Sequence, residues 1–228
     1  MTEIWDGLTK AIELLISLDP EVMEVVGRSL GISGTACLLA SLICLPLGSL
    51  IHFHHFRGKR ALINIIQTLF SVPTVLVGLL ILVLFSRAGP LGEFGILFTP
   101  PVMVIGQMIL IIPLLLGLTI SALSGVSREI VDTATSLGAS GFQAVLLVLK
   151  EARYAVLAAV IMGFGRAISE VGCALMVGGN IRGATRVITT SIALETSKGE
   201  LALAIALGII LLFLALIINI VLNRLQQR

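Results

Sequence analysis

Two residues of opposite charge, Arg166 and Glu170, lie four positions apart inside a long apolar segment. Residues at this spacing share one face of a helix, so their side chains can form an ion pair. Charged side chains inside a membrane-spanning helix are costly and usually have a function. The pair therefore fits two interpretations, a neutralising contact buried between helices or the lining of a pathway or gate.

A second apolar segment carries a polar stripe at helical spacing, formed by Asn64, Gln67 and Ser71. Polar stripes of this kind more often hold helices together than bind a substrate. We therefore expect a packing role for each residue taken alone. Gln67 and Ser71 are nevertheless candidates, together with Arg166 and Glu170, for a pathway or gate.

The residue patterns of catalysis are missing. The chain has no G-x-x-x-x-G-K-[ST] phosphate loop, no G-x-S-x-G elbow and no H-E-x-x-H helix. His52, His54 and His55 lie close together, but no carboxylate or cysteine is near them in sequence, so a solvated link is favoured over a metal site. We expect no catalytic residue, no cofactor and no metal, and any ATP hydrolysis must come from another subunit.

The composition indicates a membrane protein. Apolar residues make up 57% of the chain and charged residues only 12%, whereas soluble domains carry about 25% charged residues. The net charge of +2 gives no reason to expect nucleic acid as a partner. Cys37, Cys44 and Cys173 all fall in apolar stretches without a C-x-x-C pair, so we expect buried, unpaired cysteines.

Five apolar segments are long enough to cross a bilayer. They are residues 26–51, 61–85, 102–123, 154–177 and 201–222. A β-barrel would need alternating segments of about ten residues, which are absent. We predict an all-α polytopic membrane protein with about five spans in a single domain, residues 1–228. Pro46, Pro73 and Pro113 lie within or near the ends of spans and can kink them.

Residues 1–20 do not resemble a cleavable signal, because a basic start and a cleavage site are missing. Apolar residues recur there at helical spacing and predict an amphipathic helix over residues 4–18, lying at the membrane surface. These residues are Ile4, Leu8, Ile12, Leu15 and Ile16. Asp19-Pro20 then ends the helix before the first span.

The charges of the links favour one orientation. Arg57, Lys59 and Arg60 follow the first span, whereas residues 86–99 carry only Arg87 against Glu93. By the positive-inside rule, we expect the N-terminus outside and the C-terminus in the cytoplasm. Basic residues between the last two spans argue the other way.

On this orientation, residues 124–153 form the largest cytoplasmic piece. We expect one helix over residues 126–137, with Ser127 or Ser124 as its N-cap, and a second over residues 139–149. Gly138 ends the first helix. Ordinary links between spans are shorter, so this helix-turn-helix is expected to receive force from a partner.

The same piece resembles the coupling loop of permease subunits in ABC importers. That family has Glu-Ala-Ala and then a glycine four residues after the second alanine, and here Asp132-Thr133-Ala134 precedes Gly138-Ala139-Ser140. The family usually closes the loop with Leu-Pro, where this chain has Lys150-Glu151. The resemblance implies that this segment docks on a cytoplasmic ATP-binding subunit. The residues so implied are Asp132, Thr133, Ala134, Gly138, Ala139 and Ser140.

A second stretch is similar to oxyanion permeases, and to tungstate permeases in particular. It comprises residues 165–172, 178–181 and 183–200, and the likeness extends over most of the chain from about Ser29. The resemblance implies the transmembrane domain of a type I ABC importer in the cell membrane. It further implies a homodimer that works with ATP-binding subunits and an extracytoplasmic oxyanion-binding protein.

Donor groups for an anion occur in the same stretch. Arg182 and Arg186 lie one turn apart if their segment is helical, and Thr185 and Asn180 add polar side chains. A divalent oxyanion needs such donors. Contact with acidic residues of the binding protein is an equally good interpretation.

Two alternatives stay open. Molybdate and sulfate permeases share the looser pattern, and discrimination would lie in the separate binding protein. A carrier or channel driven by an ion gradient is the alternative of another class, although only two charges lie in mid-span and no inverted repeat is visible. For a membrane enzyme, no suitable set of residues is found.

Overall fold

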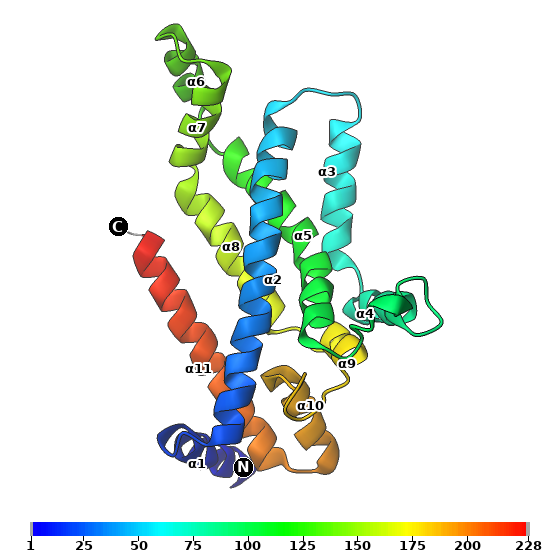
Figure 1. The fold of residues 1–228 in the computed structure, drawn as a ribbon. Helices are drawn as coiled ribbons and strands as arrows, with labels where there is room; N and C mark the ends of the chain where they lie inside the picture. Colours follow the sequence, from blue (N-terminus) through cyan, green and yellow to red (C-terminus); the bar gives the residue numbers. More distant parts are fainter. Residues whose placement is uncertain (1, 227–228) are drawn as a thin grey trace.

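The computed structural model describes residues 2–226, and its regular elements are all helical (Figure 1). No strand occurs among these residues. The α-helices are α1 (Thr2–Ile16), α2 (Pro20–Phe53), α3 (Lys59–Thr68), α4 (Thr74–Phe85), α5 (Pro100–Ser124), α6 (Arg128–Ser136), α7 (Gly141–Glu151), α8 (Arg153–Ile168), α9 (Gly172–Gly178), α10 (Ile188–Lys198) and α11 (Leu201–Gln226). Two short 3-10 helices are η1 (Leu69–Ser71) and η2 (Gly92–Phe94). The all-α prediction is confirmed.

Three helices, α2, α5 and α11, are each long and apolar enough to cross a membrane. Helices α2 and α5 form the most extensive contact of the bundle. Small residues of α2 permit this approach: a Cβ added to Gly48 would lie 2.9 Å from Cγ2 of Thr119. Cys37 and Cys44 are buried in the same interface, and Cys173 is buried elsewhere in the core, as expected.

The other two predicted spans are broken: the kink expected at Pro73 is present, whereas the helix expected to carry both Arg166 and Glu170 is interrupted between them. Between α3 and α4 the chain bends by 93°, and between α8 and α9 it bends by 57°. Pro73 accounts for the first break, since it lacks a backbone donor and disfavours a helical residue before it. Counting each bent pair as one span gives the expected total of five. Pro46 and Pro113, by contrast, lie inside helices that continue through them.

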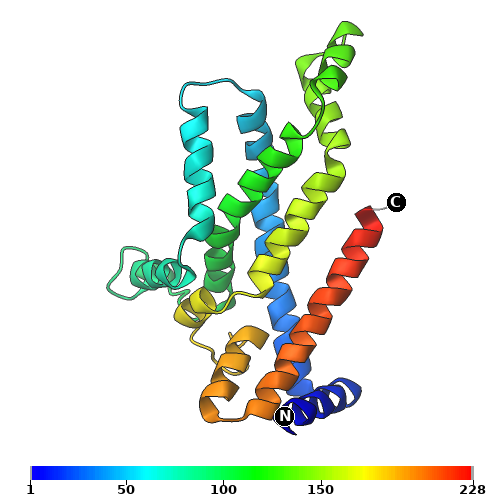
Figure 2. The same ribbon diagram turned by 180° about the vertical axis from the view of Figure 1, so that it is seen from behind.

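Helix α1 lies across one end of the bundle and packs on the start of α11 (Figures 1 and 2). A Cβ added to Gly7 would lie 2.5 Å from Cγ2 of Ile205, so glycine is required for this close crossing. The carboxylate of Asp19 accepts hydrogen bonds from the backbone N–H groups of Glu21 and Val22. This cap starts α2 immediately after α1.

The helix pair α6–α7 projects from the opposite end of the bundle (Figure 1). Helix α10 and the links that flank it lie near α1. Helix α4 and residues 86–99 extend sideways from the middle. The fold therefore has an α6–α7 end and an α1 end, and the two broken spans lie between them.

Candidate functional site

The projecting pair α6–α7 is built by strong local signals. Ser127 caps α6, since its hydroxyl accepts a hydrogen bond from the N–H of Glu129 at 3.2 Å. Ser140 caps α7 in a reciprocal capping box with Gln143. The predicted helix-turn-helix is confirmed, with helix bounds shifted by about two residues.

Gly138 makes the turn between the two helices. Its φ is +89°, a region that disfavours residues with a Cβ. The N–H of Ala139 donates to the carbonyl of Ala134 at 3.0 Å, and this bond closes the end of α6. A glycine four residues after Ala134 therefore lies at the position where a left-handed helix C-cap requires it.

Three large apolar side chains of this pair are exposed. Leu137 is 84% exposed and Phe142 is 77% exposed, and Leu146 is exposed one turn after Phe142. We call these three side chains the apolar tip. The sequence analysis did not identify them. The signal that could have done so is the spacing in α7, where Phe142 and Leu146 share the exposed face and Ala144 and Val148 share the buried face.

The inner face of α7 fastens the tip to the bundle. Val148 packs with Leu123 of α5 and Ala152 in a small core, against which Phe53 of α2 also packs. This core connects α7 with the ends of α2 and α5. Around the tip, Asp132, Thr133 and Ser140 are exposed, and Ala134 and Ala139 are half-buried. The carboxylate of Asp132 has no ion pair with the side chains that the structure describes.

Arg166 and Glu170 do form an ion pair, with 2.7 Å between Nη1 and Oε2. The pair is not intrahelical, because α8 ends at Ile168 and Glu170 lies in the break before α9. The other carboxylate oxygen of Glu170 accepts the N–H of Cys173 at 2.9 Å. The backbone carbonyl of Glu170 accepts a hydrogen bond from the hydroxyl of Thr189 at 2.7 Å. Glu170 therefore joins α8, α9 and α10 at the bend.

The two breaks of the spans lie next to each other. A cavity of about 70 Å³ is lined by Arg166 together with Leu69, Phe70 and Val72 from the first break. The Arg166 side chain is 37% exposed, whereas that of Glu170 is 3% exposed. Helices α4 and α9 pack together on the far side of both breaks. A buried carboxylate and a partly accessible guanidinium thus lie where the two spans bend.

The polar stripe of α3 is not used for packing within the chain. Asn64, Gln67 and Ser71 are all exposed, so the interpretation of helix glue does not hold inside one copy. Ser169, at the second break, is exposed as well. These side chains lie on the free surface of apolar segments. They need water or a partner beside them, because lipid offers polar groups no hydrogen bonds.

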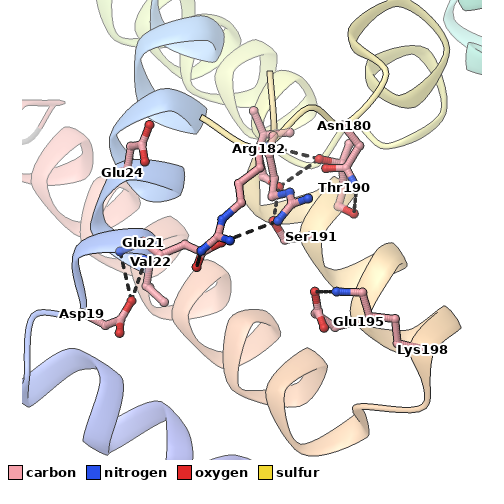
Figure 3. A network of polar contacts seen from close by, with 12 residues as sticks. Asp19, Glu21, Val22, Glu24, Asn180, Arg182, Thr190, Ser191, Glu195 and Lys198 are labelled. Atoms are coloured by element: carbon pink, nitrogen blue, oxygen red, sulfur yellow. Dashed lines mark hydrogen bonds and ion pairs between the residues drawn. The ribbon is translucent and has the colours of Figure 1, made fainter. Parts of the chain in front are cut away.

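At the α1 end, two arginines converge on one carboxylate (Figure 3). The Glu21 carboxylate lies 2.6 Å from Nη2 of Arg182 and 3.6 Å from Nη1 of Arg186. Arg28, which pairs with Glu24, donates to the carbonyl of Arg186 at 2.9 Å. These contacts tie the link before α10 to the start of α2, beside a cavity of about 450 Å³.

The arginines are not on a helix, so the condition for their spacing of one helical turn is not met: residues 182–185 form turns between α9 and α10. Arg182 is 73% exposed in its side chain and Arg186 only 17%. Thr185 is fully buried, and its hydroxyl accepts the N–H of Ile181 and donates to the carbonyl of Gly178. Asn180 donates to the carbonyl of Thr190 at 3.2 Å.

Thr185 and Asn180 therefore hold the link in shape, and the Thr185 hydroxyl already donates its hydrogen within the chain. Arg182 alone of the four candidates presents a widely exposed cation. Glu21 is the partner that sequence reasoning missed, because 161 residues separate it from Arg182. The described residues contain no group of three or more metal-ligating side chains that could hold an ion.

A family model and curated relatives both match this chain over most of its length. The family model described as "Binding-protein-dependent transport system inner membrane component" matches residues 44–228. A tungstate uptake system permease protein, TupB, of Peptoclostridium acidaminophilum is 43% identical over 227 residues, covering 100% of both chains. The TupB protein of Campylobacter jejuni is 39% identical over 224 residues, covering 98% of this chain and 94% of that one.

A solved structure shares the fold. A chain in the crystal structure of a bacterial alginate ABC transporter, in complex with an alginate-bound periplasmic protein, matches with a TM-score of 0.76. The match covers 97% of this chain and 86% of the other, at 18% sequence identity. The arrangement of broken spans and projecting helices is therefore that of an ABC importer transmembrane domain.

Proposed function

The chain belongs to the family of binding-protein-dependent transport system inner membrane components, and on that premise we propose that it is the permease subunit of an ATP-driven tungstate importer. The observation that carries the coupling part is the projecting α6–α7 pair with its apolar tip. Likeness over the full length to permeases named for tungstate supports the cargo. This chain supplies the pathway, and a partner subunit hydrolyses ATP.

The ATP-binding subunit docks on the coupling segment, residues 124–153. Leu137 and Phe142 are exposed on a projecting element, where large apolar side chains indicate a binding surface. Asp132 stands on the same helix pair with a carboxylate ready for a basic residue of the partner. Closure of the ATP-binding subunits on ATP moves α7, and the core around Val148 transmits this movement to α2 and α5.

This assignment fixes the orientation of the chain. If α6–α7 is in the cytoplasm, then the α1 end, with the N-terminus, lies outside. Helix α11 starts at the α1 end and runs back toward the α6–α7 end (Figure 2), so in this orientation its last turns point toward the cytoplasm. The orientation agrees with the basic residues Arg57, Lys59 and Arg60 after α2, which then face the cytoplasm.

Two copies of the chain enclose the pathway. Gln67 and Ser71 are polar, exposed and unused within one copy, as a water-filled pathway between copies requires. Arg166 and Glu170 lie at the adjoining breaks, where α4 and α9 can tilt relative to α3 and α8. We assign these four residues to the pathway and its gate, with Glu170 as the buried fixed point and Arg166 as the accessible charge.

The extracytoplasmic binding protein docks at the α1 end. Arg182 is widely exposed although it already pairs with Glu21, so it can also reach a carboxylate of the receptor. Arg186 is mostly buried and holds the link to α2. Arg182 is therefore the contact with the receptor, whereas Arg186, Thr185 and Asn180 position it.

Uptake by cells tests the proposal. Cells with and without this gene are supplied with tungstate, molybdate or sulfate at submicromolar concentration, and the uptake of each anion is counted. We expect selective loss of tungstate uptake in cells that lack the gene. Loss of molybdate or sulfate uptake instead would keep the importer and change its cargo. Unchanged entry of all three, with no redundant uptake system present, would refute an oxyanion importer.

A further inference from the structure

Helix α1 divides its surface into three sectors along its length. One sector, made of Gly7, Ala11 and Leu14, is buried against the bundle. A polar sector comprises Glu3, Asp6, Thr9, Lys10 and Glu13. The third sector is apolar and exposed, and it consists of Ile4, Trp5, Leu8, Ile12 and Ile16. At 3.6 residues per turn, the buried sector lies between the polar sector and the apolar sector.

The exposed apolar sector is not explained by packing within the chain. Of the predicted stripe, Leu15 packs on the bundle, whereas Ile4, Leu8, Ile12 and Ile16 are exposed, because the small residues Gly7 and Ala11 make the close contact with α11. Trp5 is 67% exposed beside this stripe. A helix with a continuous apolar strip and a separate polar side needs a partner or a lipid phase to cover the strip.

The neighbouring spans decide which medium this is. Helix α1 is followed after three residues by α2, which spans the membrane, and it packs on the first turns of α11, which also spans it. It lies across both of them at the end of the bundle (Figures 1 and 2). A helix placed there lies at the boundary between lipid and water, with one side available to each.

We propose that the apolar sector of α1 is immersed in the outer leaflet of the bilayer and anchors the α1 end of the bundle at the lipid surface. Trp5 lies at the depth of the headgroups, where tryptophan is enriched in membrane proteins. The polar sector faces the extracellular side. The anchor holds the start of α11, and with it the end of the bundle that carries Arg182 and Glu21, at a fixed height.

The charges of α1 predict how the anchor is held. Its polar sector carries Glu3, Asp6 and Glu13 against Lys10 alone, whereas helices that bind anionic lipids are rich in lysine and arginine. Anionic headgroups therefore do not attract α1. Apolar burial and the short connection to α2 hold it in place, so its immersion is independent of salt and of anionic lipid.

The chain offers a direct reporter, since Trp5 is its sole tryptophan. The full-length protein is reconstituted in phosphatidylcholine vesicles that contain lipids brominated near the headgroup or near the chain end. We expect Trp5 to lose most of its fluorescence to bromines near the headgroup and less to bromines at the chain end. Aqueous iodide should quench it weakly. The same values are expected with anionic phosphatidylglycerol added and at high salt.

A matched control moves the reporter to the polar sector. In the double variant Trp5→Phe/Asp6→Trp, the tryptophan should be quenched by iodide and spared by brominated lipid. Quenching of Trp5 by iodide as strong as that of the control would show that the sector faces water and would overturn the proposal. Protection of Trp5 from both quenchers would also overturn it, because a second copy of the chain would then cover the sector.

Discussion

The turn at Gly138 supports the sharpest prediction, because the effect of its backbone angle can be distinguished from the effect of steric contacts with its neighbours. Its φ of +89° costs a residue with a Cβ roughly 1–2 kcal/mol. No atom lies within 4 Å of a Cβ added there, so a side chain meets no steric obstacle within the chain. In Gly138→Val the strain acts only on the turn, and it is relieved when the turn rearranges.

Rearrangement of this turn moves Leu137 relative to Phe142 and so changes the apolar tip, whereas the core around Val148 stays intact. We expect Gly138→Val to reach the membrane in normal amount, to lose co-purification with the ATP-binding subunit and to lose most of its tungstate uptake. Gly138→Asn is the matched control, since asparagine accepts left-handed φ values at lower cost. It should keep most of the uptake.

Two results would refute this reasoning. Normal uptake by Gly138→Val would show that the turn does not position the docking surface. Equal damage from Gly138→Asn and Gly138→Val would show that space for the partner, and not the backbone angle, makes glycine necessary.

Three further predictions concern the other parts of the machine. Arg166→Met should lower the free energy of unfolding, measured by thermal unfolding in nanodiscs, by about 2 kcal/mol, which is less than the ~3–5 kcal/mol lost from a fully buried pair because Arg166 is 37% exposed. The double variant Arg166→Met/Glu170→Gln should recover most of this loss. No recovery would contradict a structural role for the pair. Phe142→Ser should weaken co-purification of the ATP-binding subunit at least tenfold with unchanged thermal stability, since burial of a phenylalanine contributes ~1.5–3 kcal/mol; full retention of the subunit would exclude the tip from docking. Arg182→Ala should weaken receptor binding and leave the melting temperature unchanged, whereas Arg186→Ala should lower the melting temperature, because only Arg186 is mostly buried; the reverse pattern would exchange their roles.

The parts that sequence predicted best are those that local signals build. The caps of Ser127 and Ser140 and the turn at Gly138 lie within a few residues of the groups that they bond, so the helix pair could be placed before its structure was known. The apolar spans followed from composition. The number of spans was right for the same reason.

The bends and the charge network depended on contacts between distant residues. Proline at position 73 indicated a kink but not a bend of 93°. The break before α9 contains no proline and is held in part by Thr189, which lies 19 residues after Glu170. The partner of Arg182 comes from the start of α2. Periodicity also could not show that Gly7 and Ala11, rather than the isoleucine stripe, make the contact of α1 with the bundle.

Reconstituted transport tests the central claim most directly. Proteoliposomes that contain this chain and its ATP-binding subunit, with ATP inside and tungstate-loaded binding protein outside, are assayed for tungstate accumulation. We predict accumulation that stops when ATP, the ATP-binding subunit or the binding protein is omitted, and that persists when ion gradients are collapsed. Accumulation by the chain alone, driven by an ion gradient, would contradict the account and establish an autonomous carrier.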